Sequence, residues 1–199
     1  MAYKILKKYI KENSCNIYIP VVVNGELIHD GNRRKLENQH IRLDLFPDMT
    51  DESILDVGFN SGYILFQLKK RYGGECTGID NDKNMFWIAQ KIKEIEKLDV
   101  NLYLSNFNNI DLNIARKYDN VLYLGLTLYV GILKILPKLL MLAKKRVIIE
   151  PANHEGKSKE EIKKYVEDLC NFGYKAKLLG FTDYQHRGLI QIDKKEDSK

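Results

Sequence analysis

The sequence predicts an α/β fold built on a central, mostly parallel sheet. From position 53 onward, short apolar runs typical of strands alternate with amphipathic segments typical of helices, the pattern of strands joined by crossover helices. No internal repeat of fixed period and no polar low-complexity stretch divides the 199 residues. With 44% hydrophobic and 30% charged residues, the chain has enough apolar material for one sizeable core. We therefore expect a single domain over residues 1–199.

The elements of the predicted core follow one another in a regular order. The expected strands cover 53–58, 75–80, 100–105, 120–125 and 146–151, and the expected helices cover 61–72, 84–97, 110–118 and 128–145. The clearest helix is 84–97, because Met85, Ile88 and Ile92 recur at a spacing that places them on one face. Pro137 is expected either to begin the last helix at its first turn or to kink it.

The carboxyl-terminal part adds a helix and a pair of strands. Three capping residues predict a helix over 159–173, namely Ser158 as the N-cap, Glu161 three positions later and Gly173 as the stop. Two strand-like runs follow that are close enough to pair antiparallel, and a frayed tail comes after them: 174–181, 187–193 and 194–199.

A hairpin is predicted before the first core strand. Asn24-Gly25, between the apolar runs IYIPVVV and ELIH, is the strongest short-range hairpin signal in the chain. A helix is expected to follow it, from about Arg33 to Phe46. Residues 1–50 are too few for a domain of their own, so we expect this hairpin and helix to cap a core formed by 51–193.

Charge and cysteine content exclude several classes of protein. A net charge of +5 permits an RNA partner without indicating one. Cys15, Cys76 and Cys170 form neither a CxxC pair nor a group with histidines, so no metal site and no disulfide framework are expected. The first residues lack the apolar run of a signal peptide, and no run of about 18 apolar residues occurs. We expect a soluble, cytoplasmic protein with no membrane partner.

The strongest candidate for a ligand-binding motif lies where the first core strand turns into its helix, in the sequence DVGFNSG at 56–62. Doubly wound sheets bind ligands at such turns. A dinucleotide fingerprint needs glycine at 58, 60 and 63, whereas this chain has Gly58, Asn60 and Tyr63, which disfavours a nicotinamide or flavin site. No GKS or GKT follows, so a P-loop is excluded.

DVGFNSG, with the acidic residue that ends the next strand in TGID, resembles motif I and the acidic loop of class I S-adenosylmethionine-dependent methyltransferases. The resemblance covers 53–193. It implies a Rossmann-like, doubly wound sheet of seven strands in the order 3-2-1-4-5-7-6, with S-adenosyl-L-methionine as the cofactor. Two residues depart from the family: Phe59, where Cys, Thr or Ser is common, and Asn60, where Gly is common.

The resemblance implies a role for each strand end in holding this cofactor. Gly58, Asn60 and Gly62 would form the wall for its methionine part, although without a ligand these glycines mark only a tight turn. Asp80 would accept hydrogen bonds from the ribose hydroxyls, as a carboxylate fixed at a strand end can. The other expected cofactor residues are Asp56, interpreted chiefly as a buttress of the turn, Asn81 beside Asp80, Asn106 and Phe107 around the adenine, and Leu124 bordering the methyl group.

The variant G-x-N-x-G-Y narrows the resemblance. Together with NGELIHDGNRR upstream and GFTDYQHRGLIQI near the end, it is similar to a subgroup that contains tRNA wobble-uridine carboxymethyl-type transferases and methyltransferases of cell-surface glycan pathways. The chain is shorter than the larger relatives of that subgroup, and their substrates are not carried over.

Two candidates for catalysis follow from their place after the fifth strand. His154 is the best-placed general base, with Glu150 just upstream. A base is not obligatory, because the methyl donor is already activated and the enzyme mainly supplies alignment. An exposed loop histidine without a catalytic role is the alternative.

Basic and aromatic residues near the cleft are the candidates for binding the acceptor. Arg33 and Arg34, and Arg187 at the start of the last strand, are expected to clamp a phosphate or carboxylate, with a plain surface role as the alternative. Tyr129 and Tyr123 are candidates for shaping the pocket, with a place in the core as the alternative.

The expected function is therefore S-adenosylmethionine-dependent methyl transfer to a hydroxyl or similar nucleophile on a small molecule, a glycan or an RNA nucleotide. DNA is not expected, because YLGLTLY stands where exocyclic-amine DNA methylases carry D/N-P-P-Y/F. The alternative is a catalytically silent cofactor-binding or interaction protein. A basic stripe at the cleft mouth would favour RNA, and an enclosed pocket beneath the hairpin would favour a small molecule.

Overall fold

The computed structural model describes residues 2–13, 17–33, 35–112, 115–154, 156–182 and 184–195. Cys15 and Arg34 lie outside this part of the chain. The helix predicted from about Arg33 is α2 (Leu36–Asp44).

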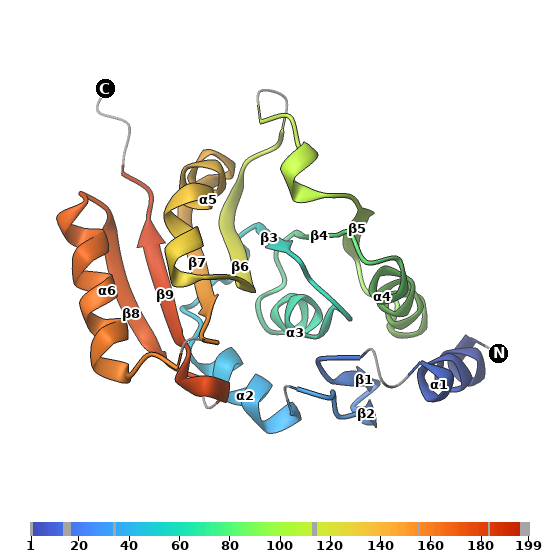
Figure 1. The fold of residues 1–199 in the computed structure, drawn as a ribbon. Coiled ribbons are helices and arrows are strands. Elements are labelled where there is room, and N and C mark those ends of the chain that lie inside the picture. Colours follow the sequence, from blue (N-terminus) through green and yellow to red (C-terminus); the bar gives the residue numbers. More distant parts are fainter. Residues whose placement is uncertain are drawn as a thin grey trace.

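A seven-stranded sheet runs through the centre of the molecule (Figure 1). Its strands are β3 (Ile54–Val57), β4 (Cys76–Asp80), β5 (Val100–Leu104), β6 (Tyr118–Leu128), β7 (Ala143–Ala152), β8 (Lys175–Phe181) and β9 (Gly188–Asp193). They lie in the order β5-β4-β3-β6-β7-β9-β8, which confirms the predicted order 3-2-1-4-5-7-6. The first five are parallel to one another, and β9 is antiparallel to both β7 and β8.

Helices cover both faces of the sheet, because successive side chains of a buried strand point to opposite sides. Ile54 and Leu122 pack with α3 (Tyr63–Tyr72) and α4 (Lys83–Glu96) in one cluster, whereas Leu55 and Val121 pack with α5 (Tyr129–Leu142) and α6 (Lys159–Asn171) in the other. Ser158 and Glu161 form the predicted capping box at the start of α6.

The amino-terminal cap begins with a helix that the sequence patterns did not predict, α1 (Ala2–Glu12). The hairpin of β1 (Val21–Val23) and β2 (Glu26–His29) turns at Asn24 and Gly25, which both have positive φ, as a two-residue hairpin turn requires. Several polar contacts tie this cap to the core. Tyr9 donates to Asn84 Oδ1 at 2.8 Å, and Ser61 Oγ donates to the Pro20 carbonyl at 3.0 Å.

One core prediction needs correction, and one open alternative is decided. The short helix expected over 110–118 is absent from residues 110–112 and 115–117, and a 3-10 turn, η2 (Phe107–Asn109), precedes that stretch instead. Tyr118, the last residue of the stretch, already begins β6. Of the two places expected for Pro137, the structure shows the second, inside a helix that is already running.

The helices in the described part of the chain include none that is both long and apolar enough to cross a bilayer.

Candidate active site

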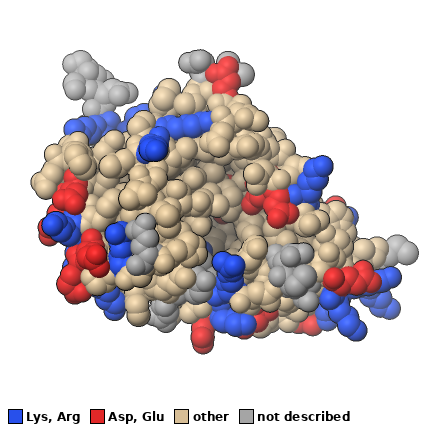
Figure 2. Space-filling model, in the orientation of Figure 1, with Lys and Arg blue, Asp and Glu red and all other residues tan. Residues whose placement is uncertain are grey.

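A cleft opens at the carboxyl ends of the parallel strands, where β3 and β6 lie side by side and lead to helices on opposite faces of the sheet. It has two parts. The cap cavity, about 260 Å³, lies against the cap residues Tyr18, Ile19 and Arg33. The strand-end cavity, about 290 Å³, lies at the ends of β4 and β5. Figure 2, in the orientation of Figure 1, shows a hollow near the middle of the molecule.

The turn between β3 and α3 contains three residues in the left-handed region: Gly58 (φ +74°), Asn60 (φ +54°) and Gly62 (φ +85°). Glycine adopts this conformation without penalty, and Asn is among the side chains that tolerate it best. Asn60 therefore keeps the turn geometry at a position where the family commonly has glycine. Gly58 and Asn60 line both cavities. Gly62 lines neither cavity and is the N-cap residue of α3. A Cβ added to Gly62 would lie 2.6 Å from the Phe66 ring.

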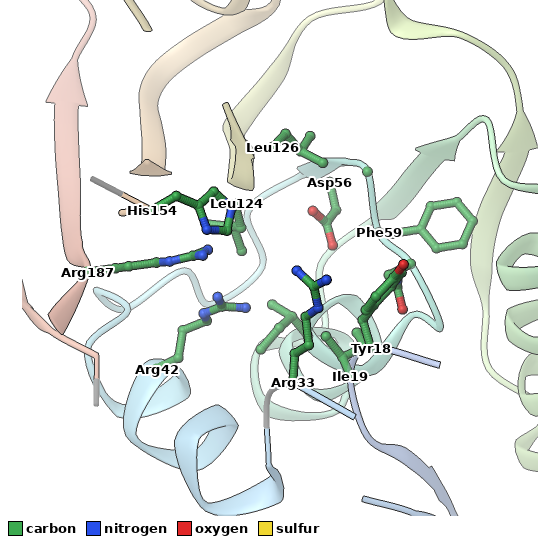
Figure 3. A pocket seen from close by; sticks show the side chains of 14 residues that line it. Tyr18, Ile19, Arg33, Arg42, Asp56, Phe59, Leu124, Leu126, His154 and Arg187 are labelled. Carbon is green, nitrogen blue, oxygen red and sulfur yellow. The ribbon is translucent and has the colours of Figure 1, made fainter. Parts of the chain in front are cut away.

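Phe59, the second departure from the family, serves packing behind the turn. Its side chain is buried, and a Cβ on Gly78 of β4 would lie 2.6 Å from its ring. In Figure 3 the ring points away from the other labelled side chains. Phe59 also lines the cap cavity, so the departure affects both the support of the turn and the surface of the cleft.

Asp80 connects the glycine turn to the end of β4. Its Oδ2 accepts from the Asn60 N–H at 2.7 Å and its Oδ1 from the Asp82 N–H at 2.8 Å. Burial raises the pKa of the Asp80 carboxyl, while these two backbone donors oppose the rise. A carboxylate offers about four acceptor sites, so these two donors leave acceptor capacity for a ligand. Asp80 and the exposed Asn81 both line the strand-end cavity.

The far wall of the strand-end cavity is the η2 turn. Asn106 caps this turn by accepting from the Asn108 N–H at 2.9 Å, and Phe107 packs into the core below it. Lys138 of α5 holds the turn from outside: its Nζ donates to the carbonyls of Phe107 at 2.7 Å and Asn108 at 3.0 Å, and lies 4.7 Å from the Phe107 ring centroid. Asn106 and Phe107 both line the strand-end cavity.

Asp56 is the last but one residue of β3 and contributes a carboxyl to the cap cavity. Burial, and next the charge of Asp80, raise its pKa to about 7, while Arg42 acts in the opposite direction. Near neutral pH this carboxyl is therefore poised between its two charge states. A cationic group entering the cavity would favour the ionised form.

Glu150 is not available as a base in this structure. It is fully buried at the end of β7, where it forms an ion pair with Arg42 of α2 and accepts from Thr182 Oγ1 at 3.1 Å. A carboxylate so engaged holds α2 against the sheet. This corrects the expectation that Glu150 acts beside His154.

His154 is exposed and lines the cap cavity, as does Leu124 at the end of β6. The loop that carries His154 is organised by the buried Asn153. The Asn153 side chain accepts from the Lys157 N–H at 2.8 Å and donates to the carbonyls of Lys157 and Gln185 at 3.0 and 2.9 Å. The place of His154 just after the fifth core strand therefore correctly indicated that it lies at the cleft.

Three arginines line the cap cavity, and Figure 3 shows their side chains extending into it from different elements. Arg33 is exposed and lies over the Tyr18 ring at 5.1 Å. Arg187 directly precedes β9 and donates to Gln185 Oε1 from Nε at 3.1 Å and from Nη2 at 2.6 Å. Arg42 carries the third guanidinium. Both arginines predicted for the acceptor and described by the structure thus lie at this cavity.

Tyr129 has the core position that was named as its alternative, whereas Tyr123 lines a cavity. Tyr129 is 2% exposed, packs edge-on against Tyr165 and is absent from the lining of both cavities, so its place is in the core. Its hydroxyl oxygen accepts from the Gly188 N–H at 3.4 Å. Tyr123 lines the strand-end cavity, with its ring centroid 6.4 Å from that of Phe107.

Sequence reasoning missed several residues of the cleft, among them Tyr18, Arg42 and Leu126. A signal for Arg42 existed, because α2 buries Gln39, Arg42 and Leu43 at the spacing of an inward-facing stripe. Polar residues on such a stripe indicate a buried polar contact. Nothing in the sequence identified Tyr18, which reaches the cleft only through the fold of the cap.

The glycine turn, Asp80 and the η2 turn all fall within one matched segment. Residues 54–143 match the family model of a methyltransferase domain. This methyltransferase segment runs from β3 to the end of α5 and excludes the cap, His154 and Arg187. No match to the sequence was found among the curated proteins.

Solved structures of methyltransferases have a similar fold. A methyltransferase from Pyrococcus furiosus is 16% identical at a TM-score of 0.65, and magnesium protoporphyrin IX methyltransferase from Synechocystis PCC 6803, with bound S-adenosylmethionine, is 17% identical at 0.65. In both cases the match covers 98% of each chain. The bifunctional kinase-methyltransferase WbdD is 16% identical at a TM-score of 0.60, and the match covers 77% of this chain and 39% of WbdD. The fold is that of the methyltransferases, and fold and family match together support S-adenosylmethionine as the cofactor.

Proposed function

We propose that this protein is a methyltransferase that transfers the methyl group of S-adenosylmethionine to a small acceptor bearing an anionic group. The observation that carries the proposal is the Asp80 carboxylate, fixed by two backbone donors beside a left-handed glycine turn. A ribose diol fits such a carboxylate, because its two hydroxyls can donate to the acceptor sites that the backbone leaves over.

The described residues fit the two ends of this cofactor. Asp80, Asn106 and Phe107 surround the strand-end cavity and would hold ribose and adenine. Asp56 offers a carboxylate in the cap cavity for the ammonium of the methionine part. Gly58 lies between the two cavities, where the absence of a side chain lets a ligand approach the backbone. The Asn60 variant of the turn supports the finer proposal that the chain belongs to the G-x-N-x-G-Y subgroup.

The chemistry asks little of the protein beyond alignment. When bound, S-adenosylmethionine supplies an activated methyl group for direct displacement by the acceptor. The cap cavity holds the acceptor in line with that methyl group and limits access of water. His154 is the group that would take the proton from a hydroxyl acceptor, because it lines this cavity and Glu150 is held by Arg42.

The arginines favour an anionic acceptor. Arg33 and Arg187 approach the cap cavity from opposite parts of the chain, and guanidinium groups bind carboxylate and phosphate through two parallel hydrogen bonds. Lys and Arg form no continuous band around the hollow among the residues coloured in Figure 2. We therefore favour a phosphorylated or carboxylated small molecule, or the anionic end of a glycan, over a long RNA.

Methyl transfer is tested with labelled S-adenosylmethionine and a panel of phosphorylated and carboxylated metabolites, anionic glycans and RNA. We expect label on an anionic small molecule or glycan, and a KM for that acceptor several-fold higher in Arg33→Ala at unchanged affinity for the cofactor. Arg116→Ala, at an exposed ion pair with Glu75, is the matched control. Transfer to RNA alone would overturn the acceptor class. Tight cofactor binding without transfer to any acceptor would favour the catalytically silent alternative.

A further inference from the structure

Leu126 separates the two cavities of the cleft. Its side chain lines both, as do Gly58 and Asn60. A Cβ built on Gly58 would lie 2.6 Å and 2.7 Å from the two methyl carbons of Leu126, and 3.1 Å from its Cγ. The leucine therefore packs directly on the backbone of Gly58, in the space that the missing side chain leaves.

This position conflicts with a ligand that spans both cavities. On the proposed function, the adenosine and methionine parts of the cofactor occupy different cavities, so the link between them must cross Gly58. Atoms of the link and of Leu126 cannot occupy the same space. Because the cofactor is a single molecule, Leu126 has to leave this position before both halves can bind.

The backbone around Leu126 is built to permit such a movement. Gly125 precedes it with φ +75°. The pairing of β6 with β7 is interrupted between Leu124, opposite Glu150, and Leu128, opposite Ala152. Three residues of β6 thus face a single residue of β7, Pro151, which has no N–H to donate to them. The Leu126 side chain is also 47% exposed, so it is held by contacts on one side only.

We propose that Leu126 is a gating and positioning residue whose side chain must swing off Gly58 to admit the cofactor. This inference rests on the proposed function, because it needs a ligand that occupies both cavities. Gly125 is the hinge, and the interrupted segment 125–127 is the part that moves. Adenosine alone fits the strand-end cavity and does not require the passage to open.

The gate is tested by the rate of association of S-adenosylhomocysteine in stopped-flow fluorescence, with adenosine as the second probe. Leu126→Ala removes the methyl groups that cover Gly58, so we expect association with S-adenosylhomocysteine to be about tenfold faster. Leu126→Phe is expected to slow it, and adenosine affinity is expected to change less than about threefold in either variant. Leu133→Ala, an exposed leucine of α5 that lines neither cavity, is the control and should match the wild type.

The possible results separate the gate from the proposed function. Equal or slower association in Leu126→Ala, with a wild type that binds S-adenosylhomocysteine, would overturn the gate and leave the cofactor site standing. A folded wild type that binds neither S-adenosylhomocysteine nor adenosine would overturn both.

Discussion

The two cavities of the cleft are assembled in different ways. The strand-end cavity is held by contacts between neighbouring segments of the sheet: Asp80 accepts from Asn60 and Asp82, and Asn106 from Asn108. The cap cavity depends on contacts between distant segments, such as Arg42 with Glu150, which are 108 residues apart in sequence. The first cavity is thus a property of the sheet, whereas the second exists only once the cap has docked on it.

The largest expected effect is a loss of folding stability when the ion pair that holds the cap cavity together is broken. Glu150→Gln leaves Arg42 buried without its charge partner, which costs about 3–5 kcal/mol of stability when a buried pair is broken. We expect urea denaturation to show a loss of this size. Glu75→Gln, in the exposed pair with Arg116, should lose less than about 1 kcal/mol. A comparably small loss for Glu150→Gln would mean that the pair does not hold the cap cavity together.

The second prediction concerns the strand-end cavity. Asp80→Ala removes the acceptor for the ribose hydroxyls and is expected to weaken S-adenosylmethionine binding by at least about tenfold, as loss of charge-assisted hydrogen bonds does. Circular dichroism should still show a folded protein. Asp99→Ala, an exposed aspartate at the opposite end of the sheet, is the control for a lost negative charge. Unchanged affinity in Asp80→Ala would remove Asp80 from the site.

The third prediction is a pH dependence of ligand binding that arises from Asp56 in the cap cavity. The raised pKa of Asp56, about 7, means that the carboxyl is largely protonated at pH 6 and largely ionised at pH 7.5. Since the ionised form attracts the ammonium of the ligand, affinity for S-adenosylhomocysteine should rise several-fold over this range. Calorimetry at the two pH values checks this. The rise should vanish in Asp56→Asn, and a rise that persists in that variant would have another origin.

The smallest expected effect concerns the support of the adenine side. Lys138→Met keeps the length of the side chain but loses its hydrogen bonds to the η2 carbonyls, so affinity for adenosine should fall by about three- to fivefold. Lys134→Met, an exposed lysine of the same helix, should have no effect, and Lys138→Arg should restore part of the loss. Equal losses in Lys134→Met and Lys138→Met would point to a general effect of charge.

The same contrast explains what the sequence could predict. Strands, their order and the residues at their carboxyl ends follow from local periodicity and from motif I, so Asp80, Asn106 and Phe107 could be placed without a structure. Glu150 and Tyr129 were misplaced because position along the chain does not reveal a partner on another element, here Arg42 for Glu150 and the Gly188 N–H for Tyr129. Tyr18 and Leu126 enter the cleft through the docking of the cap and the irregular end of β6, which leave no periodic signal.

The central claim is that the glycine turn and Asp80 form a site for S-adenosylmethionine. It is tested most directly by calorimetric titration of the purified protein with S-adenosylmethionine and, separately, with S-adenosylhomocysteine, because neither experiment requires the acceptor. We expect both to bind with micromolar dissociation constants and a stoichiometry of one. A folded sample that binds neither would show that the turn is only structural and would contradict the proposed function.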